Sequence, residues 1–268
     1  MDAAELELMR LAPAYLPALL RVGAVLAVAP PFASVAVPRR MRVLLAMGLT
    51  LGLMPVGVIP QQPASAGQWI IGQWIIGLGG EMLIGLAMGL ALGMVFAAAR
   101  IAGELVANQM GLSLPEVYDP AGGGGGGAGG QGTAMGQAYG LIAVIVFFAM
   151  NGHHAMLQAV ATSFSTVPMM TTAQSPAAAG LLAGLLQSAT VLALKLAAPV
   201  FVATLIADLA MGMVARTVPQ LGVMTAGITV RAIAGLLVML AAIAMTVAAM
   251  QGAFAGIGQS MAGLFAGR

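Results

Sequence analysis

The sequence predicts an all-α membrane protein, built from about six long, partly broken helices arranged in hairpins. The chain is 60% hydrophobic and only 7% charged, whereas soluble domains carry roughly 25% charged residues. Apolar stretches near the length of a membrane span, about 20 residues, recur from one end to the other. No stretch mixes charged and apolar residues as a separate water-soluble domain would, so the whole chain is expected to be membrane-embedded or membrane-associated.

Prolines, glycines and short polar loops divide the apolar sequence into segments. The fourth segment is interrupted at Asn151-Gly152, and the fifth holds Pro199. A proline inside a helix removes a backbone hydrogen bond and bends or breaks the helix. The expected helices cover approximately residues 11–30, 43–59, 69–99, 138–164, 180–214 and 223–250.

Basic residues indicate one topology for six crossings. Arg39, Arg40 and Arg42 follow the first segment, and cytoplasmic loops carry an excess of Lys and Arg. On the same alternation, Arg100 and Arg216 also fall on cytoplasmic ends. The acidic N-terminus, with Asp2, Glu5 and Glu7, falls outside and lacks the positive region of a signal peptide.

A polar, glycine-rich stretch at residues 109–136 interrupts the apolar helices and includes the run Gly122–Gly127. Irregular backbone cannot face lipid, because its unpaired polar groups each cost several kcal/mol there. The stretch therefore leaves the membrane or lines a protein-walled, water-filled space. It has no Gly-Lys-Ser/Thr sequence, so it is not a phosphate-binding P-loop.

Five charged residues lie inside apolar segments, where a charge at mid-membrane costs at least about 2.5 kcal/mol. Three interpretations stay open: ion pairs that hold the assembly together, helices packed against other subunits outside the lipid, or an ion relay using Lys195 and Asp208. Arg100 and Glu104, spaced i and i+4, are candidates for a further pair on one helix face. The five residues are Arg21, Glu81, Lys195, Asp208 and Arg231.

Gly85, Gly89 and Gly93 form two overlapping GxxxG frames in the third segment. Small residues at this spacing allow helix backbones to approach closely. The frames predict either packing within the chain or a packing face for another subunit.

The sequence also excludes several functions. It has no cysteine, which rules out disulfides, thiol catalysis and cysteine metal sites. HExxH, GxSxG and SxxK motifs are absent, and adjacent His153 and His154 point about 100° apart on a regular helix, a poor arrangement for one metal. We therefore expect no enzyme activity, no metal and no cofactor, and the net charge of +2 gives no reason to expect nucleic-acid binding.

Four groups of residues, in order along the chain, resemble the FliR/SctT family of type III secretion export-gate subunits. Two features depart from the family pattern: the glycine expansion after Pro120, and Gly222 where the family has Asn. The groups are Arg21 with Pro31-Phe32-Ala33-Ser34, Val37-Pro38-Arg39, Arg42 and Leu44-Leu45-Ala46; Gly103-Glu104 with Gln109-Met110-Gly111-Leu112-Ser113 and Asp119-Pro120; Asn151-Gly152-His153 with Ser163-Phe164 and Val167-Pro168; and Ala198-Pro199 with Asp208-Leu209, Gly212, Arg216 and Val218-Pro219-Gln220-Leu221-Gly222-Val223.

The resemblance implies a non-enzymatic gate subunit of the bacterial inner membrane, with part of the assembly on the periplasmic side. One copy of this chain would join FliP-like and FliQ-like membrane subunits, and an FlhB-like subunit, to pass unfolded export substrates. Residues 1–179, with the loop 109–136, would be FliP-like, and residues 180–268 a FliQ-like hairpin and tail. A stand-alone ion-coupled transporter remains the alternative.

The resemblance also implies roles for individual residues. Buried or assembly charges would include Arg21, Glu81, Arg100, Glu104, Lys195, Asp208, Arg216 and Arg231. A plug projecting into the channel would comprise Met110, Gly111, Leu112, Ser113, Leu114, Pro115, Tyr118, Asp119 and Pro120.

Overall fold

The computed structural model describes residues 3–34, 37–54, 71–113, 132–170, 177–217 and 223–266. These ranges are almost entirely helical and contain no strand, which confirms the all-α prediction. The helices are α1 (Ala3–Val28), α2 (Pro30–Ala33), α3 (Arg39–Leu53), α4 (Ile71–Met110), α6 (Ala134–Ala149), α7 (Gly152–Thr166), α8 (Ala177–Thr217), α9 (Val223–Ala241) and α10 (Ile243–Ala266).

The chain forms two compact units, and each unit is assembled from segments that are not consecutive in the sequence. The first comprises Met1–Met94, Asn151–Leu185 and Phe254–Arg268, and the second comprises Val95–Met150 and Leu186–Ala253. The long helices α4 and α8 each contribute to both units.

The first unit is built around α1, which packs against α3, the N-terminal part of α4, and α7. Its buried side chains include Val22 and Val25 of α1, Met88 of α4 and Phe164 of α7. These residues come from three helices that lie far apart in the sequence, so the unit closes only through long-range contacts.

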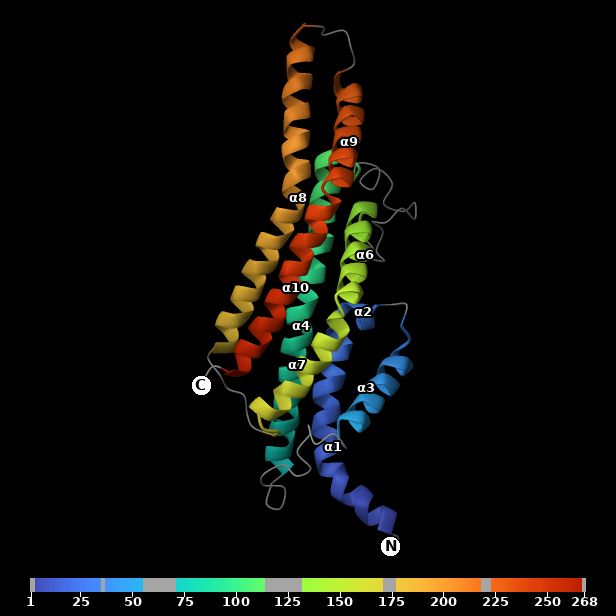
Figure 1. Cartoon of the computed structure of the whole chain (residues 1–268), viewed down its shortest axis with the longest axis vertical. Helices are drawn as coiled ribbons and strands as arrows, with labels where there is room; N and C mark the ends of the chain where they lie inside the picture. Colours follow the sequence, from blue (N-terminus) through green and yellow to red (C-terminus); the bar gives the residue numbers. More distant parts are fainter. Residues whose placement is uncertain are drawn as a thin grey trace. The chain divides into compact units, whose positions relative to one another are not determined.

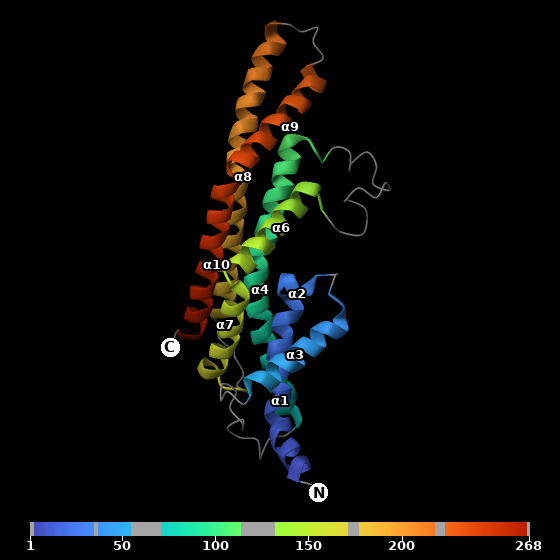
Figure 2. The ribbon, with the colours of Figure 1, turned by 45° about the vertical axis from the view of Figure 1, so that its right-hand side comes forward.

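The second unit pairs the C-terminal part of α4 with α6, and it contains the hairpin that α8 from Leu186 onward makes with α9 and with α10 as far as Ala253 (Figures 1 and 2). The Phe96 and Phe147 rings meet edge to face, with centroids 5.5 Å apart. Ala99, Val106 and Tyr139 are buried with them.

Two apolar segments are split into pairs of helices. Asn151 lies between α6 and α7 in the left-handed conformation, with φ 55°, which is the break expected at Asn151-Gly152. Between α9 and α10 the axis bends by 59° at Ala242, a break that the sequence did not indicate. Pro199, in contrast, is accommodated inside α8 without ending it.

Among the described residues, two helices are long and apolar enough to cross a membrane, Gly72–Met110 and Ala183–Thr217, or up to four if each bent pair counts as one span. The expected crossings at residues 11–30 and 43–59 are not among them, and each includes positions, 11–14 and 55–59, whose side chains lie outside the described part of the chain. The described side chains of α1, Tyr15–Val28, form only a short apolar helix. Helix α3 has 15 residues and begins with Arg39 and Arg40, so it spans about 22 Å against a hydrocarbon core of about 30 Å.

Candidate functional site

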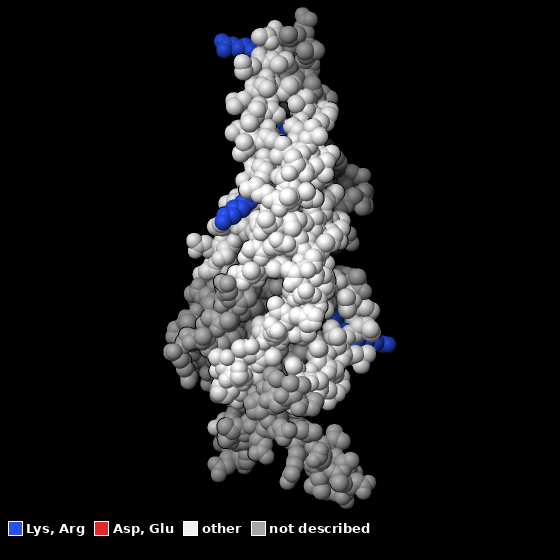
Figure 3. Space-filling view, in the orientation of Figure 1, with Lys and Arg blue, Asp and Glu red and all other residues white. Residues whose placement is uncertain are grey.

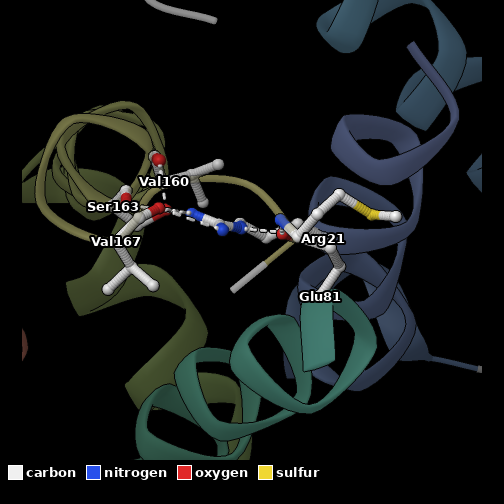
Figure 4. A network of polar contacts seen from close by, with 6 residues as sticks. Arg21, Glu81, Val160, Ser163 and Val167 are labelled. Carbon is white, nitrogen blue, oxygen red and sulfur yellow. Dashed lines mark hydrogen bonds and ion pairs between the residues drawn. The ribbon is translucent and has the colours of Figure 1, made fainter. Parts of the chain in front are cut away.

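A fully buried ion pair joins α1 to α4 in the first unit. Arg21 Nε lies 2.6 Å from Glu81 Oε2, and both side chains are 0% exposed. Both residues sit in apolar stretches of their helices, so each supplies the charge that compensates the other. Figure 4 shows the guanidinium of Arg21 between Glu81 and the end of α7.

The remaining donors and acceptors of this pair are used by α7 and the residues after it. Arg21 Nη1 donates to the carbonyl oxygen of Ser163 at 2.9 Å and to its Oγ at 3.2 Å, and both Nη atoms donate to Val167 O at 3.3 Å. Glu81 Oε1 accepts from the backbone N–H of Met170 at 2.7 Å. The Arg21 guanidinium also lies 4.5 Å from the centre of the Phe164 ring, a cation–π distance.

This network links α1, α4 and α7. A buried ion pair is tolerated when additional hydrogen bonds satisfy its other polar atoms, and here they come from three separate chain segments. Both carboxylate oxygens of Glu81 already accept hydrogen bonds, and neither side chain reaches water. The arrangement fixes α1, α4 and α7 relative to one another.

A second ion pair connects the hairpin of the second unit. Arg231 of α9 reaches Asp208 Oδ1 of α8 with Nε at 2.7 Å and with Nη2 at 2.6 Å. Both side chains are 35% exposed. The structure thus places Asp208 with Arg231 and not with Lys195, the other residue considered for an ion relay.

The other charges named from the sequence lie at exposed or partly exposed positions. Lys195, on α8, and Arg100, on α4, are exposed, as is Arg216 in the last turn of α8, where a cation is favourable for the helix dipole. Glu104 is partly buried beside Gly132 and Gly136. The described residues show no ion pair between Arg100 and Glu104 of the kind their spacing allows.

The GxxxG glycines of α4 face α1 of the same chain. A Cβ built on Gly85 would lie 2.3 Å from Arg21 O, and one on Gly89 would lie 3.0 Å from Val25 O. Gly93 is less crowded, with Pro30 Cγ at 3.8 Å. The two backbones approach this closely only because residues 85 and 89 lack side chains, and the approach brings Glu81, one turn before Gly85, to Arg21.

The second unit holds both ends of the glycine-rich loop. At its C-terminal end Thr133 caps α6 by accepting the N–H of Gly136 on Oγ1 at 3.0 Å, a favourable N-cap. Here α4 and α6 touch backbone to backbone, because a Cβ on Gly103 would lie 2.4 Å from Met135 O. The Glu104 side chain lies along the same contact, where a Cβ on Gly136 would be 3.1 Å from its Cγ.

At its N-terminal end the loop begins where α4 stops. Gly111 has φ 75°, Leu112 N–H donates to Ala107 O at 2.9 Å, and Gly111 N–H donates to Asn108 O at 3.1 Å. This is a Schellman helix end, which requires a left-handed residue and favours glycine. Gln109 and Met110 are therefore the last helical residues of α4, and residues 134–136 already belong to α6, so the loop is shorter than residues 109–136.

The structure describes only part of the plug named from the sequence. Met110 is buried, Leu112 is exposed, and Gly111 and Ser113 are intermediate. The other members, Leu114, Pro115, Tyr118, Asp119 and Pro120, lie outside the described residues.

Several contacts could not be found by examining charged residues. The carbonyls of Ser163 and Val167 and the N–H of Met170 act through the backbone, which leaves no signature in residue type. The sequence indicates Arg42 as a topology marker and as part of the family resemblance, but not as a structural contact. Its Nη2 donates to Ala33 O, Ser34 O and Val37 O at 3.1, 2.7 and 3.0 Å. It holds the turn that precedes α3.

Within the described residues, no group of three or more His, Cys, Asp or Glu side chains could hold a metal ion.

Comparison with known proteins gives consistent matches. Residues 12–257 match the family model of bacterial export proteins, family 1. The chain is 29% identical to the flagellar biosynthetic protein FliR of Pectobacterium carotovorum subsp. carotovorum over 81% of this chain and 79% of that protein. It is 28% identical to the protein of that name from Escherichia coli (strain K12), over 83% of this chain and 81% of the relative. It is 22% identical to the surface presentation of antigens protein SpaR of Shigella flexneri, over 57% of each.

Proposed function

The chain belongs to bacterial export protein family 1, and from that premise we propose that it is a structural subunit of a type III protein export gate. In this role it helps to form and close the channel through which unfolded proteins leave the cell. The observation that carries the proposal is the family match over residues 12–257, which takes in every helix described above at least in part.

The flagellar export apparatus is the better-supported system. The relatives named for flagellar biosynthesis cover 81% and 83% of the chain at 29% and 28% identity. SpaR covers 57% at 22% identity. The longer and closer matches favour a flagellar gate in the bacterial inner membrane, with part of the assembly on its periplasmic side.

Exposed apolar faces support a membrane-bound, multi-subunit setting. The hairpin leaves Leu209 and Met213 of α8 64% and 74% exposed, and Leu237 and Leu240 of α9 are exposed as well. The described residues on the face drawn in Figure 3 are almost entirely uncharged, with a few Lys and Arg and no Asp or Glu visible among them. A surface of this kind needs lipid or another protein against it.

The proteins that cover these faces are proposed to be FliP-like, FliQ-like and FlhB-like subunits, with one copy of this chain in the complex. The C-terminal hairpin from residue 180 onward would provide the FliQ-like part, and residues 1–179 the FliP-like part. The two ion pairs support this assignment, since they satisfy charges that would otherwise face lipid or need a relay function.

The loop after α4 is proposed as the plug of the channel. Its first residues, Met110–Ser113, include the helix end of α4, which fixes the direction in which the chain leaves the helix. A loop in a water-filled channel has its backbone hydrogen-bonded by water, and a segment that arriving substrates must displace suits low local stability. No catalytic role is proposed.

Affinity purification of the tagged full-length chain from its own membranes tests the proposed function. We expect two further membrane proteins, FliP-like and FliQ-like, to co-purify at high ratio to the bait, and secretion of flagellar proteins to stop when the chain is deleted. Purification as a monomer or small homo-oligomer, with secretion intact in the deletion strain, would instead indicate a stand-alone transporter.

A further inference from the structure

Met110, the last residue of α4, lies directly on the backbone of Gly235 in α9. A Cβ built on Gly235 would lie 2.6 Å from Met110 Cγ, 2.9 Å from Sδ and 3.1 Å from Cε. Three successive atoms of the methionine side chain therefore pack against the position where a side chain on residue 235 would begin. Met110 is 1% exposed and Gly235 is buried, so any larger residue at position 235 would have to displace the methionine.

The position of Gly235 is coupled to the hairpin that carries it. Arg231, one helical turn before Gly235 and on nearly the same side of α9, forms the ion pair with Asp208 of α8. The pair holds α9 to α8 just where Gly235 meets α4. The ion pair and the contact with Met110 are therefore one helical turn apart on α9.

The two ends of the loop are held differently. The C-terminal end is fixed by the Thr133 cap and by the backbone contact of Gly103 with Met135. The N-terminal end follows Met110, whose contact with Gly235 is made by a flexible, unbranched side chain through dispersion. A contact of this kind can separate and re-form with no hydrogen bond to break, whereas the cap and the backbone contact cannot yield without disturbing α6.

We propose that Gly235 is a positioning residue that seats Met110 and so holds the start of the plug in the closed gate, and that Met110 leaves this seat when the gate opens. The proposal rests on the proposed function. It assigns to the C-terminal hairpin the role of setting whether the loop is held or released.

A reversible cross-link tests whether the contact must separate. Because Met110 Cγ is one bond, about 1.5 Å, from its Cβ, the Cβ atoms at positions 110 and 235 lie within about 4.1 Å. Disulfides join Cβ atoms about 3.5–4.5 Å apart, and the natural chain has no cysteine. The double variant Met110→Cys/Gly235→Cys is therefore expected to form a disulfide in the assembled complex.

Secretion is then measured in living cells before oxidation, after oxidation, and after a reductant is added. We expect the oxidised double variant to assemble normally, to lose about tenfold or more of its secretion, and to recover it on reduction. The single-cysteine variants under the same oxidant are the controls. A disulfide that forms and leaves secretion unchanged overturns the proposal, and so does failure of the two cysteines to cross-link in the assembled complex.

A steric pair of variants tests the seat without oxidation. Gly235→Ala places a methyl group against Met110, whereas a Cβ on Gly227 of the same helix would meet no atom within 4 Å. We expect Gly235→Ala to raise passive ion flux through assembled complexes about tenfold, as a shift of about 1.4 kcal/mol in the closed state would, and Gly227→Ala to leave it unchanged. Equal flux from the two variants contradicts the seat.

Failure of the proposed Met110–Gly235 seat can be distinguished from failure of the proposed function. If the chain does not belong to an export gate, the deletion strain secretes normally, and oxidation of the double variant leaves that secretion unchanged. If only the seat is wrong, deletion stops secretion, and the oxidised and reduced double variants secrete equally.

Discussion

Two arginine–carboxylate pairs within the chain differ in how completely they are enclosed. Arg21 and Glu81 are 0% exposed and surrounded by acceptors and donors from α7 and the residues that follow it, whereas Asp208 and Arg231 are 35% exposed. Removing one partner of a buried pair leaves an uncompensated charge, which costs about 3–5 kcal/mol. A pair that water or a neighbouring polar group can reach loses much less.

Glu81→Gln is therefore expected to be far more damaging than Asp208→Asn. Each change keeps the size of the side chain and removes one charge. We expect Glu81→Gln to lower the apparent melting temperature of the purified protein by about 10 °C and to reduce recovery of the complex. Asp208→Asn should have a small effect on melting.

For both substitutions, secretion per recovered complex is expected to stay near the wild-type value, because neither pair is assigned a transport step. Equal melting temperatures for the two variants would contradict the enclosed character of the Arg21–Glu81 pair. Loss of secretion with normal recovery of Asp208→Asn would revive the ion-relay interpretation.

At the scale of the elements, the contact between α1 and α4 depends on absent side chains. A methyl group on Gly85 would overlap Arg21 O and Ala24 Cβ, at 2.3 and 2.8 Å, whereas one on Gly79, earlier in α4, would meet no atom within 4 Å. The same substitution thus has opposite consequences at two positions of one helix.

We expect Gly85→Ala to destabilise the protein by about 1–3 kcal/mol, the usual cost of overpacking, because α1 has to move away from α4. Gly79→Ala should be neutral or stabilising by up to about 1 kcal/mol, since alanine is the better helix former. Thermal unfolding of the two variants in detergent measures the difference. A Gly85→Ala protein as stable as Gly79→Ala would show that the helices do not approach as described.

The existence of the helices could be predicted from the sequence better than their ends. Hydrophobicity ended the third segment at residue 99, but α4 continues through Arg100 and Glu104 to Met110. Hydrophobicity measures what can face lipid, whereas the end of α4 is set by the left-handed conformation of Gly111. The bend at Ala242 involves neither proline nor glycine, so no local signal marks it.

In the candidate site, too, only part of the arrangement could be predicted from the sequence. The types of residue were predictable, because a charge in an apolar helix needs a partner, but the partners were not. Arg21 meets Glu81 across 60 residues of sequence and Ser163 across 142. These pairings result from how α1, α4 and α7 pack, which a single sequence does not reveal.

At the scale of the whole molecule, the chain combines buried polar groups that are hydrogen-bonded within the chain with exposed apolar faces that require lipid or another protein against them. The Arg21 network satisfies its own polar atoms, while Leu209 and Met213 of α8 are largely exposed. Because neither feature involves the loop after α4, we expect a change in that loop to alter the ion leak through the channel without altering assembly of the complex.

Deletion of Ser113–Pro120 tests that separation. The complex should be recovered in normal amounts, because every side chain that the structure describes as buried is retained, and membranes containing it should leak small ions. Deletion of Gly122–Gly127 shortens the same loop and is the matched control, for which we expect no added leak. Unchanged conductance with normal assembly in the first deletion would remove the plug from the proposed function.

The network around Arg21 also has a consequence for biosynthesis. Its acceptor Ser163 lies 142 residues further along the chain, and synthesis at about 5–20 residues per second delays that residue by roughly 7–30 s. Glu81 is made within this interval, 60 residues after Arg21, but the backbone acceptors of the Arg21 Nη atoms, Ser163 O and Val167 O, are not made until its end. The nascent chain must therefore keep Arg21 in contact with water, phosphate groups or the insertion machinery, and the first unit can close only after translation has passed Met170.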